Sequence, residues 1–312
     1  MSIQKVTDKK DFVKILEDNG YDKVATFLTY PNGENDSLKP KKRAFLPQEY
    51  IDSDDFFSDI NISNGFMFVG LNSAERTSDD EDEMINSDKY QTMHDVSKKS
   101  HDMSIYQSIQ NTEAYGSFAM DIMNKFVQTT VNDSWINKIC EELEKSPKEY
   151  VDNVMQISTL SPFDPYELFR FANDKTDRAK EYMSAKSNFD ELTSKINELK
   201  KQGVDSEALK DERKPYASVM KKYDKEVTLP KLIDRFISID AKVFVGIIKL
   251  LNPKCLICFG DKSYKLASSI VDHFDLNVAV EQVLHYSYTG SKDIEDITEY
   301  KRNQVKNIID KY

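Results

Sequence analysis

Residues 254–287, KCLICFGDKSYKLASSIVDHFDLNVAVEQVLHYS, hold two apolar segments separated by an amphipathic one. KCLICFG is a nearly continuous apolar run with the length of a strand, and DKSYKLASSIVDHF carries its apolar residues at helical spacing. LNVAVEQVLHYS predicts a second strand. Because apolar strands that alternate with helices pair in parallel and are covered on both faces, this stretch predicts an α/β fold.

The same alternation continues towards the N-terminus. GFMFVGLN and SFAMDIM predict two further strands, with an irregular polar stretch between the first helix and the first strand. The acidic segment SAERTSDDEDEMINSD predicts an exposed loop after the first of them. We expect helices at 8–19, 136–154, 231–251 and 291–312, the third stopped by Asn252-Pro253 and the last capped by Ser291. The prediction is a three-layer α/β/α sandwich around a central, mainly parallel four-stranded sheet.

Between residues 174 and 226 the composition shifts to Lys, Glu, Asp and Ala, which predicts a helical hairpin inserted in a single domain of residues 1–312. Within QGVDSEA, Gly203 is expected to end one helix and Ser206 to cap the next. Pro215 is expected to interrupt or kink the second arm. The mixed charges indicate a solvated arm, whose leucines and methionines would support contact with a protein partner or a second copy.

The overall composition provides enough apolar material for a packed core, since 39% of the 312 residues are hydrophobic and 11% are aromatic. The chain starts with a polar segment and contains no run of about 18 apolar residues. We therefore expect no membrane span and a soluble, cytoplasmic protein. The formal net charge of −11 argues against tight nonspecific binding to duplex DNA, but it allows a local basic cleft.

The three cysteines include the pair Cys255 and Cys258, a C-x-x-C spacing that elsewhere indicates zinc or redox chemistry. Here the pair lies in a predicted strand, where alternation places the two side chains on opposite faces. Two ligands on opposite faces cannot share one metal ion. We interpret Cys255 and Cys258 as small buried apolar residues in a reducing compartment, and we expect no metal site.

Polar or small residues follow the predicted strands where each strand ends. In open parallel sheets, ligands bind beyond the carboxyl ends of the strands, so these residues are the first candidates for a site. The asparagine, aspartate and histidine among them would converge on one small ligand. The candidates are Gly70, Leu71 and Asn72 after the first strand, Met120 and Asp121 within or at the end of the second, Gly260 and Asp261 after the third, and His285, Tyr286 and Ser287 after the last.

Several short motifs around these residues resemble those of the uracil-DNA glycosylase superfamily. FVGLNS is similar to the first motif, in its Gly-x-Asn form, and LHYSY resembles the second motif, in which His-x-Ser follows the last strand. CLICFGDKSYKLA is similar to the strand, glycine and helix between them. A closer resemblance is to uracil-DNA glycosylase-like proteins of bacteria and phages, whose Gly-Ala-Tyr-Met-Thr-Asp-Ile and Phe-His-Asp segments correspond to GSFAMDI and to TMHD.

The resemblance implies a DNA glycosylase that acts on a base flipped out of DNA, without a metal or redox cofactor, in DNA repair. It implies that Asn72 holds the attacking water and that His285 donates a hydrogen bond to a base carbonyl, for which a neutral imidazole suffices. Residues expected to contact the substrate are Gly70, Leu71, Asp121, Phe118, Ser287 and His94, with Asp95 beside the last of them.

Asp121 departs from the family pattern, because uracil-cleaving enzymes commonly use an asparagine whose amide both donates to O4 and accepts from N3–H. An ionised Asp121 only accepts hydrogen bonds, so it would repel a carbonyl and favour an exocyclic amine. The hypothesis is that the best substrate is an amino-bearing or modified pyrimidine, or a purine, rather than plain uracil. Burial that keeps the carboxyl group protonated would remove this argument.

Each of these residues also has a plainer interpretation. Asn72 after Gly70 suits an ordinary turn, Asp121 suits a helix cap or salt bridge, and His285 suits a satisfied core histidine. His94 and Asp95 suit a solvated pair in a polar segment. The flipped base would stack on Phe118, Tyr115 or Tyr106, although most aromatic residues must serve the core. KPKKR at 39–43 would touch phosphate or be ordinary surface.

A second function class stays open beside the glycosylase. The chain would then be a noncatalytic member that binds a nucleotide or nucleic acid and acts on partners through its insertion, in phage defence or phage biology. Three features favour it, namely the acidic composition, Asp121, and Ser73 and Ala74 where the family often has Pro-Gly.

Overall fold

A computed structural model describes residues 6–73, 89–94, 101–127, 131–149, 156–160, 177–289 and 296–312. The contacts between residues divide the chain into two compact units. One consists of Met1–Pro162 with Phe236–Tyr312 and contains the sheet, and the other is Phe163–Arg235 and contains the helical hairpin. No helix in the described ranges combines the length and the apolar character that crossing a membrane requires.

The first unit is built on a five-stranded sheet with the order β1-β3-β2-β4-β5. Its strands are β1 (Ala25–Phe27), β2 (Phe66–Ser73), β3 (Phe118–Val127), β4 (Cys255–Phe259) and β5 (Ala279–Val283). The strands β2 to β5 are parallel, and β1 pairs antiparallel with β3. The predicted α/β class and the four parallel strands are confirmed, and the predicted strand number was wrong by one. The additional strand is only three residues long and is stabilised by pairing with β3.

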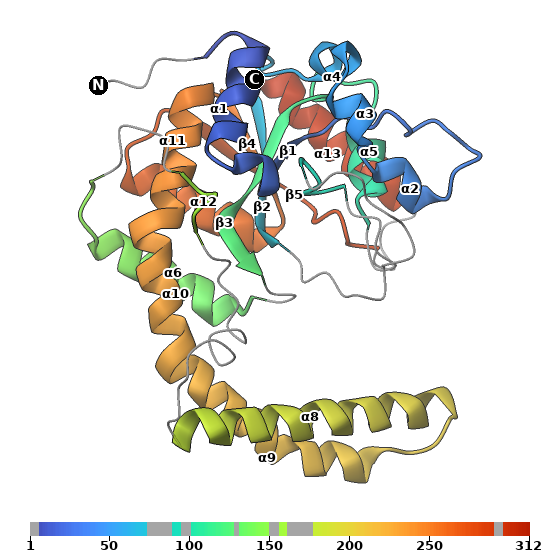
Figure 1. The fold of residues 1–312 in the computed structure, drawn as a ribbon, viewed down its shortest axis with the longest axis vertical. Helices are drawn as coiled ribbons and strands as arrows, with labels where there is room; N and C mark the ends of the chain where they lie inside the picture. Colours follow the sequence, from blue (N-terminus) through green and yellow to red (C-terminus); the bar gives the residue numbers. More distant parts are fainter. Residues whose placement is uncertain are drawn as a thin grey trace. The chain divides into compact units, whose positions relative to one another are not determined.

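Helices cover both faces of the sheet, as Figure 1 shows with α11 and α12 on one side of the strands and α5 and α13 on the other. The helices α5 (Met103–Ile109) and α13 (Ile297–Lys311) close a core with inward side chains of the strands, among them Phe68, Ile257 and Val283. On the other face, α11 (Ala241–Leu251) and α12 (Asp261–His273) pack on the sheet and α6 (Asp133–Lys145) packs on α12. The smaller elements of this unit are α1 (Lys9–Asp18), η1 (Tyr21–Lys23), α2 (Pro40–Ala44), α3 (Gln48–Ile51), α4 (Asp54–Asp59) and the π-helical turn η4 (Phe236–Asp240).

The chemistry of the helix ends explains which predicted boundaries hold. Asp8 caps α1 by accepting from the backbone of Lys10 and Asp11, and α11 stops at Asn252, which adopts a left-handed conformation at φ +51°. The helix α6 ends at Lys145, earlier than predicted, because Pro147 keeps Ser146 extended. The prediction of Ser291 as the last cap was wrong, since Asp296 caps α13. Ser291 itself lies outside the described residues.

Alternation along β4 separates its two cysteines as predicted. Cys255 belongs with Ile257 and Phe259 to the core beneath α5 and α13, so Cys258 points to the opposite face. Both thiols are free and fully buried. Burial raises the pKa of the Cys255 thiol to about 12, which keeps the thiol protonated and chemically inert at neutral pH.

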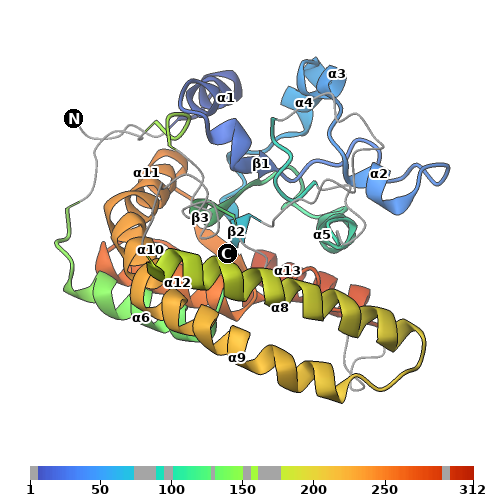
Figure 2. The ribbon, with the colours of Figure 1, turned by 60° about the horizontal axis from the view of Figure 1, so that its bottom comes forward.

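The second unit contains the predicted hairpin, formed by α8 (Asp177–Lys201) and α9 (Glu207–Tyr223), followed by the π-helical turn η3 (Asp224–Thr228) and by α10 (Leu229–Arg235). Figure 2 shows α8 and α9 lying side by side. Gly203 lies just after α8 at φ +71°, as expected for a helix end. The predicted cap was misplaced by one residue, because Asp205 rather than Ser206 accepts from the backbone N–H of Glu207. Pro215 does not interrupt the second arm, because α9 continues through it, and the predicted alternative of a kink stays a prediction.

Candidate functional site at the carboxyl edge of the sheet

Asn72 and Asp121 share one face and one edge of the sheet. In β2 the residues Phe66 and Phe68 face the core beneath α5 and α13, so alternation directs Gly70 and Asn72 to the same face. In β3 the core residue Ala119 places Asp121 on that face too. Because β2 and β3 are parallel, the two polar side chains lie at the same carboxyl edge, as the sequence predicts.

Gly70 is explained by the close approach of Asp121, its register partner on β3. A Cβ atom built on Gly70 would overlap Asp121 Oδ1 and would lie 2.9 Å from Met93 Cε. The carboxylate therefore lies directly over the backbone of Gly70, and the side chain of Asp121 is only 6% exposed. This position requires glycine because any side chain would occupy the place of the carboxylate.

Asn72 lies in an extended strand rather than in a turn. It is half-buried, pairs with Met123 on β3, and is followed by an irregularity in the β2–β3 register before Ser73. Two residues along a strand span about 6.6 Å, and neighbouring strands are about 4.8 Å apart. Asn72 therefore lies beyond the Gly70–Asp121 pair, with about 8 Å between the backbones of Asn72 and Asp121. Leu71 points to the opposite face of β2, away from this position.

His285 reaches the same edge from the segment after β5. A Cβ atom on Gly260, at the end of β4, would lie 3.4 Å from His285 Cβ, so the two strand ends are neighbours. The imidazole stacks on Tyr286 with ring centroids 4.3 Å apart, and Tyr286 packs edge-on against Phe259 of the core. His285 is therefore held on the face that α5 and α13 cover.

The hydrogen bonds of His285 define its tautomer. The backbone N–H of Ser287 donates to Nδ1 at 3.2 Å, and the Ser287 hydroxyl lies 2.7 Å from the same atom. Because a backbone N–H is only a donor, Nδ1 is an acceptor and the proton of the neutral ring sits on Nε2. Ser287, predicted as a substrate contact, thus positions the catalytic candidate.

The charge state of His285 follows from its surroundings. Its pKa is lowered to about 4, first because neighbouring protein atoms remove part of the hydration of the ring, and then by the positive charges of Lys301 and His101. His285 is exposed, so solvent screens part of the influence of the neighbouring charges on its pKa. A lowered pKa favours the neutral ring at pH 7. A neutral ring with its proton on Nε2 has one N–H donor that can serve a ligand.

Lys301 of α13 is a candidate that the sequence does not reveal. Its side chain is only 6% exposed, and Nζ donates to the backbone oxygen of Tyr286 at 2.7 Å and to Ser104 Oγ at 2.9 Å. Within the described part of the chain it has no ion pair with a carboxylate. Burial lowers its pKa, and its charge contributes to the lowered pKa of His285. A buried ammonium beside His285 would stabilise negative charge that develops at this edge.

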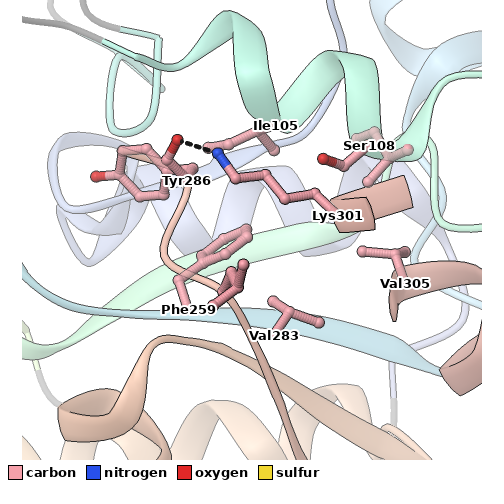
Figure 3. Close-up of a pocket in the computed structure, with 9 residues that line it drawn as sticks. Ile105, Ser108, Phe259, Val283, Tyr286, Lys301 and Val305 are labelled. Carbon is pink, nitrogen blue, oxygen red and sulfur yellow. Dashed lines mark hydrogen bonds between the residues drawn. The ribbon is translucent and has the colours of Figure 1, made fainter. Parts of the chain in front are cut away.

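Figure 3 shows Lys301 above a small cavity whose walls include Phe259, Val283 and Val305. The cavity has a volume of about 10 Å³, which is about the space of one water molecule. It is far too small for a nucleobase. Its polar contact is the bond from Lys301 to the Tyr286 oxygen, drawn as a dashed line.

Two predicted substrate contacts lie elsewhere. Phe118 points to the opposite face of β3 from Asp121 and packs in the core against Phe12 and Phe27, with ring centroids 5.4 and 5.6 Å away. It is 1% exposed, so no base can stack on it. Strand alternation alone excludes a shared face for residues 118 and 121, which are an odd number of positions apart.

His94 lies in the core rather than at the mouth of a pocket. It is 1% exposed, and its two ring nitrogens lie 2.7 Å from the backbone oxygen of Ala44 and 3.0 Å from that of Phe27. Burial lowers its pKa to about 4, against the effect of the two backbone contacts. Its role is to connect α2 with β1, and its neighbour Asp95 lies outside the described residues.

The aromatic, basic and acidic candidates that remain do not lie at the carboxyl edge or lie outside the described residues. Tyr106 and Tyr115 line a separate cavity beside the start of β3. In the predicted basic cluster, Arg43 lies 3.7 Å from Asp36 and donates to the backbone oxygen of Leu38, as an ordinary surface residue does. The predicted acidic loop, including Ala74, and the segment 128–130 after β3 lie outside the described residues.

Comparison of the chain with family models, with curated proteins and with solved structures found no match. The resemblance to uracil-DNA glycosylases therefore stays a prediction. Neither of the two cavities described above is lined by Asn72, Asp121 or His285. The case for a site at the carboxyl edge rests on the positions of Asn72, Asp121 and His285 at the ends of strands of one sheet, with Lys301 close to His285.

Proposed function

We propose that the chain hydrolyses the N-glycosidic bond of a base extruded from DNA. The observation that carries the proposal is the strand order, which gathers Asn72, Asp121 and His285 at one edge and towards one face. Ligands of open parallel sheets bind at this edge. The resemblance of the motifs around these residues to uracil-DNA glycosylases adds independent support.

The proposed reaction assigns one task to each side chain. The amide oxygen of Asn72 accepts a hydrogen bond from water, whose oxygen bonds to C1′ of the sugar as the C1′–N bond breaks. The electron pair of that bond leaves with the base, while the water proton passes to solvent. His285 donates from Nε2 to a carbonyl oxygen of the base, where the negative charge gathers. Because the ring donates as the neutral tautomer, it needs no proton from solvent.

Lys301 adds a fixed positive charge close to the leaving base. Its ammonium group donates hydrogen bonds to the Tyr286 backbone oxygen and to Ser104 Oγ, which position it before a substrate binds. A charge in a position that excludes water stabilises a nearby anion more than a solvated charge does. Lys301 therefore acts through the field at His285 and is a positioning residue rather than a catalytic one.

Asp121 sets the base preference in this proposal. Its carboxyl group lies over Gly70 and is only 6% exposed, so the base preference holds for the ionised form of the group. A carboxylate accepts from an exocyclic amine and repels a carbonyl oxygen. We expect amino-bearing or modified pyrimidines, or purines, to be released in preference to uracil.

The first experiment measures base release from oligonucleotides that contain uracil, hypoxanthine, cytosine or a modified cytosine, in single and double strands. We expect Asn72→Ala and His285→Ala each to lower single-turnover release by about 10²- to 10³-fold, the cost typical of one lost transition-state contact. His285→Gln keeps an N–H donor and should retain part of the rate. Asn137→Ala, an exposed asparagine on α6, is the matched control and should leave the rate unchanged.

A second experiment tests the role of Asp121. Asp121→Asn supplies both a donor and an acceptor, so it should move the preference towards uracil, whereas Asp121→Ala should lose discrimination. Robust uracil release by the unchanged chain that survives Asp121→Ala would contradict the proposed preference.

The alternative is a noncatalytic module that binds nucleic acid and acts through a partner. It is favoured by the fact that neither described cavity includes the three edge residues. DNA binding in a filter assay, without base release from any substrate, would support this module. Binding that persists while Asn72→Ala abolishes release would support the glycosylase.

A further inference from the structure

A second cavity lies at the opposite edge of the sheet, beside the start of β3. Its volume is about 460 Å³, within the range of pockets that hold small molecules. The segment after β1, the end of α4, the end of α5 and the segment before β3 contribute its walls. It is lined by Tyr30, Pro31, Glu34, Asn35, Asp59, Tyr106, Gln110, Asn111, Thr112 and Tyr115.

The inner wall of the cavity consists of tyrosines held in place by each other. Tyr30 and Tyr106 are buried, and their ring centroids are 5.4 Å apart. The backbone N–H of Tyr30 donates to the Tyr115 hydroxyl oxygen at 2.9 Å. Aromatic faces carry negative partial charge, so a fixed cluster of tyrosine rings favours a cation.

The cavity also presents two carboxylates, Glu34 and Asp59, and no Lys, Arg or His side chain lines it. Asp59 accepts a hydrogen bond from the Tyr50 hydroxyl at 2.7 Å. Among the residues that the structure describes, neither carboxylate has a basic partner within ion-pair distance. The nearest cationic influence is Arg43, which is itself close to Asp36 and bound to the Leu38 oxygen.

Burial and the nearby carboxylates raise the pKa values of two tyrosines in the cavity. Burial raises the pKa of Tyr115 most, and the charges of Asp59 and Glu34 raise it further. Burial and the charge of Glu34 likewise raise the pKa of Tyr106, while Arg43 lowers it. The phenols therefore stay neutral and offer their oxygen atoms as acceptors, in a space that repels anions.

The backbone preorganises the cavity. At φ +77°, Gly116 brings the chain so close to α4 that a Cβ atom there would overlap the backbone oxygen of Asp59. The Gly116 oxygen also accepts from the N–H of Asn61 at 2.8 Å. These contacts fix Asp59 beside Tyr115 before any ligand binds, which lowers the entropy cost of binding.

We propose that this cavity binds a small organic cation, an alkylammonium group that lies against the tyrosine rings and faces Glu34 and Asp59. The surrounding amide and hydroxyl groups of Asn35, Gln110 and Thr112 can accept its N–H donors. The shared chemistry is that of a free aliphatic amine or the side chain of a lysine on a partner protein. The inference does not depend on the glycosylase proposal.

The test is titration calorimetry of the full chain with 1,4-diaminobutane, with Nα-acetyl-lysine N-methylamide, and with the neutral isostere 1,4-butanediol. We expect saturable binding of at least one amine and none of the diol. Glu34→Gln and Asp59→Asn should each weaken amine binding by about tenfold, as expected for one partly solvated charge pair. Glu34 is exposed, so its substitution leaves the fold intact, and Glu144→Gln on α6 is the matched control.

Each outcome of this titration decides something. Tighter binding of the lysine derivative than of the diamine identifies a protein side chain as the ligand, and the reverse order identifies a free amine. Equal binding of the diol, binding unaffected by both acid substitutions, or no binding of either amine would overturn the proposal. Base release at the carboxyl edge is measured separately, so failure here leaves that function untouched.

Discussion

The two edges of the same sheet carry opposite chemistry. At the carboxyl edge, His285 accepts at Nδ1 and so carries its proton on Nε2, the buried Lys301 supplies positive charge, and the carboxyl group of Asp121 lies over Gly70. At the amino edge, tyrosines and two carboxylates without basic partners in the described residues surround a cavity. The formal net charge of −11 averages over both edges and describes neither. Function in this fold must therefore be argued from local charge, edge by edge.

One short helix contacts both edges. Ser104, in the first turn of α5, accepts from Lys301, whereas Tyr106 of α5 and Gln110 just after it line the tyrosine cavity. A helix of seven residues is only about 10 Å long. The ammonium group of Lys301 and the open cavity with its two carboxylates therefore lie near opposite ends of one short helix.

The largest loss of stability is expected from substitution of His94, whose ring packs against Tyr30 of the tyrosine cavity. The neutral ring of His94 donates its one N–H to the backbone oxygen of Ala44 or of Phe27, so His94→Ala removes a buried hydrogen bond and creates a hole, and we expect a loss of about 3–5 kcal/mol in the free energy of unfolding. Urea unfolding measures it, and His101→Ala, at an exposed position, should cost under about 0.5 kcal/mol. A cost below about 1 kcal/mol for His94→Ala would mean that the two contacts do not hold β1 to α2.

The second effect belongs to the carboxyl edge. Gly70→Ala places a methyl group where Asp121 Oδ1 lies, and overpacking of this kind costs about 1–3 kcal/mol. The same substitution in an Asp121→Ala background should cost clearly less, because the overlapping atom is gone. Equal costs in the two backgrounds, measured by urea unfolding, would show that the carboxylate does not lie over Gly70.

The pH dependence of stability distinguishes buried histidine from ordinary surface histidine. The pKa of His94 is about 4 in the folded chain and near 6.5 when unfolded, so the unfolded state binds more protons between these values. Its stabilising contribution is complete above pH 6.5 and is lost as the pH falls towards 4. Between pH 7.5 and 5.5 we expect a loss of about 1 kcal/mol from His94 alone. The measurement is urea unfolding of the His285→Ala variant at both pH values, because this variant lacks the similar contribution of His285. A free energy of unfolding that does not fall between pH 7.5 and 5.5 would contradict the prediction.

The smallest effect tests the link between Lys301 and His285. Lys301→Met keeps the length of the side chain but removes its charge, so the pKa of His285 should rise towards its ordinary value while overall stability changes by less than about 1 kcal/mol. NMR titration of the His285 ring measures this shift. Lys306→Met, at an exposed position on the same helix, is the control and should leave the titration unchanged. An unchanged pKa of His285 in Lys301→Met would show that the charge of Lys301 does not affect the His285 ring.

The long apolar strands were predictable, and the short one was not. KCLICFG and FMFVG contain enough buried apolar residues to predict β4 and β2 from periodicity alone. The strand β1 has three residues and owes its conformation to pairing with β3, a contact that no local pattern records. Ser206 and Ser291 were chosen as caps by residue type, but neighbouring aspartates make the capping bonds.

The candidate site divides in the same way. Asn72 and Asp121 were predictable because parallel strands present their carboxyl ends at one edge. Strand alternation places Phe118 and Asp121 on opposite faces, so the sequence itself argues against Phe118 as a substrate contact. His94 reads as polar and exposed, and Lys301 reads as one of many helical surface lysines, yet both are buried.

The sequence by itself determined the strand and helix pattern and the polar residues at the ends of the strands, because both follow from short-range periodicity and from the direction of the chain. Only the tertiary structure decided which of those residues lie close together, how Asp121 lies over Gly70, and that tyrosines and carboxylates from three separate segments line one open cavity. The physical reason is that burial and electrostatic potential at a point depend on every neighbour in space, and most of those neighbours are remote along the chain.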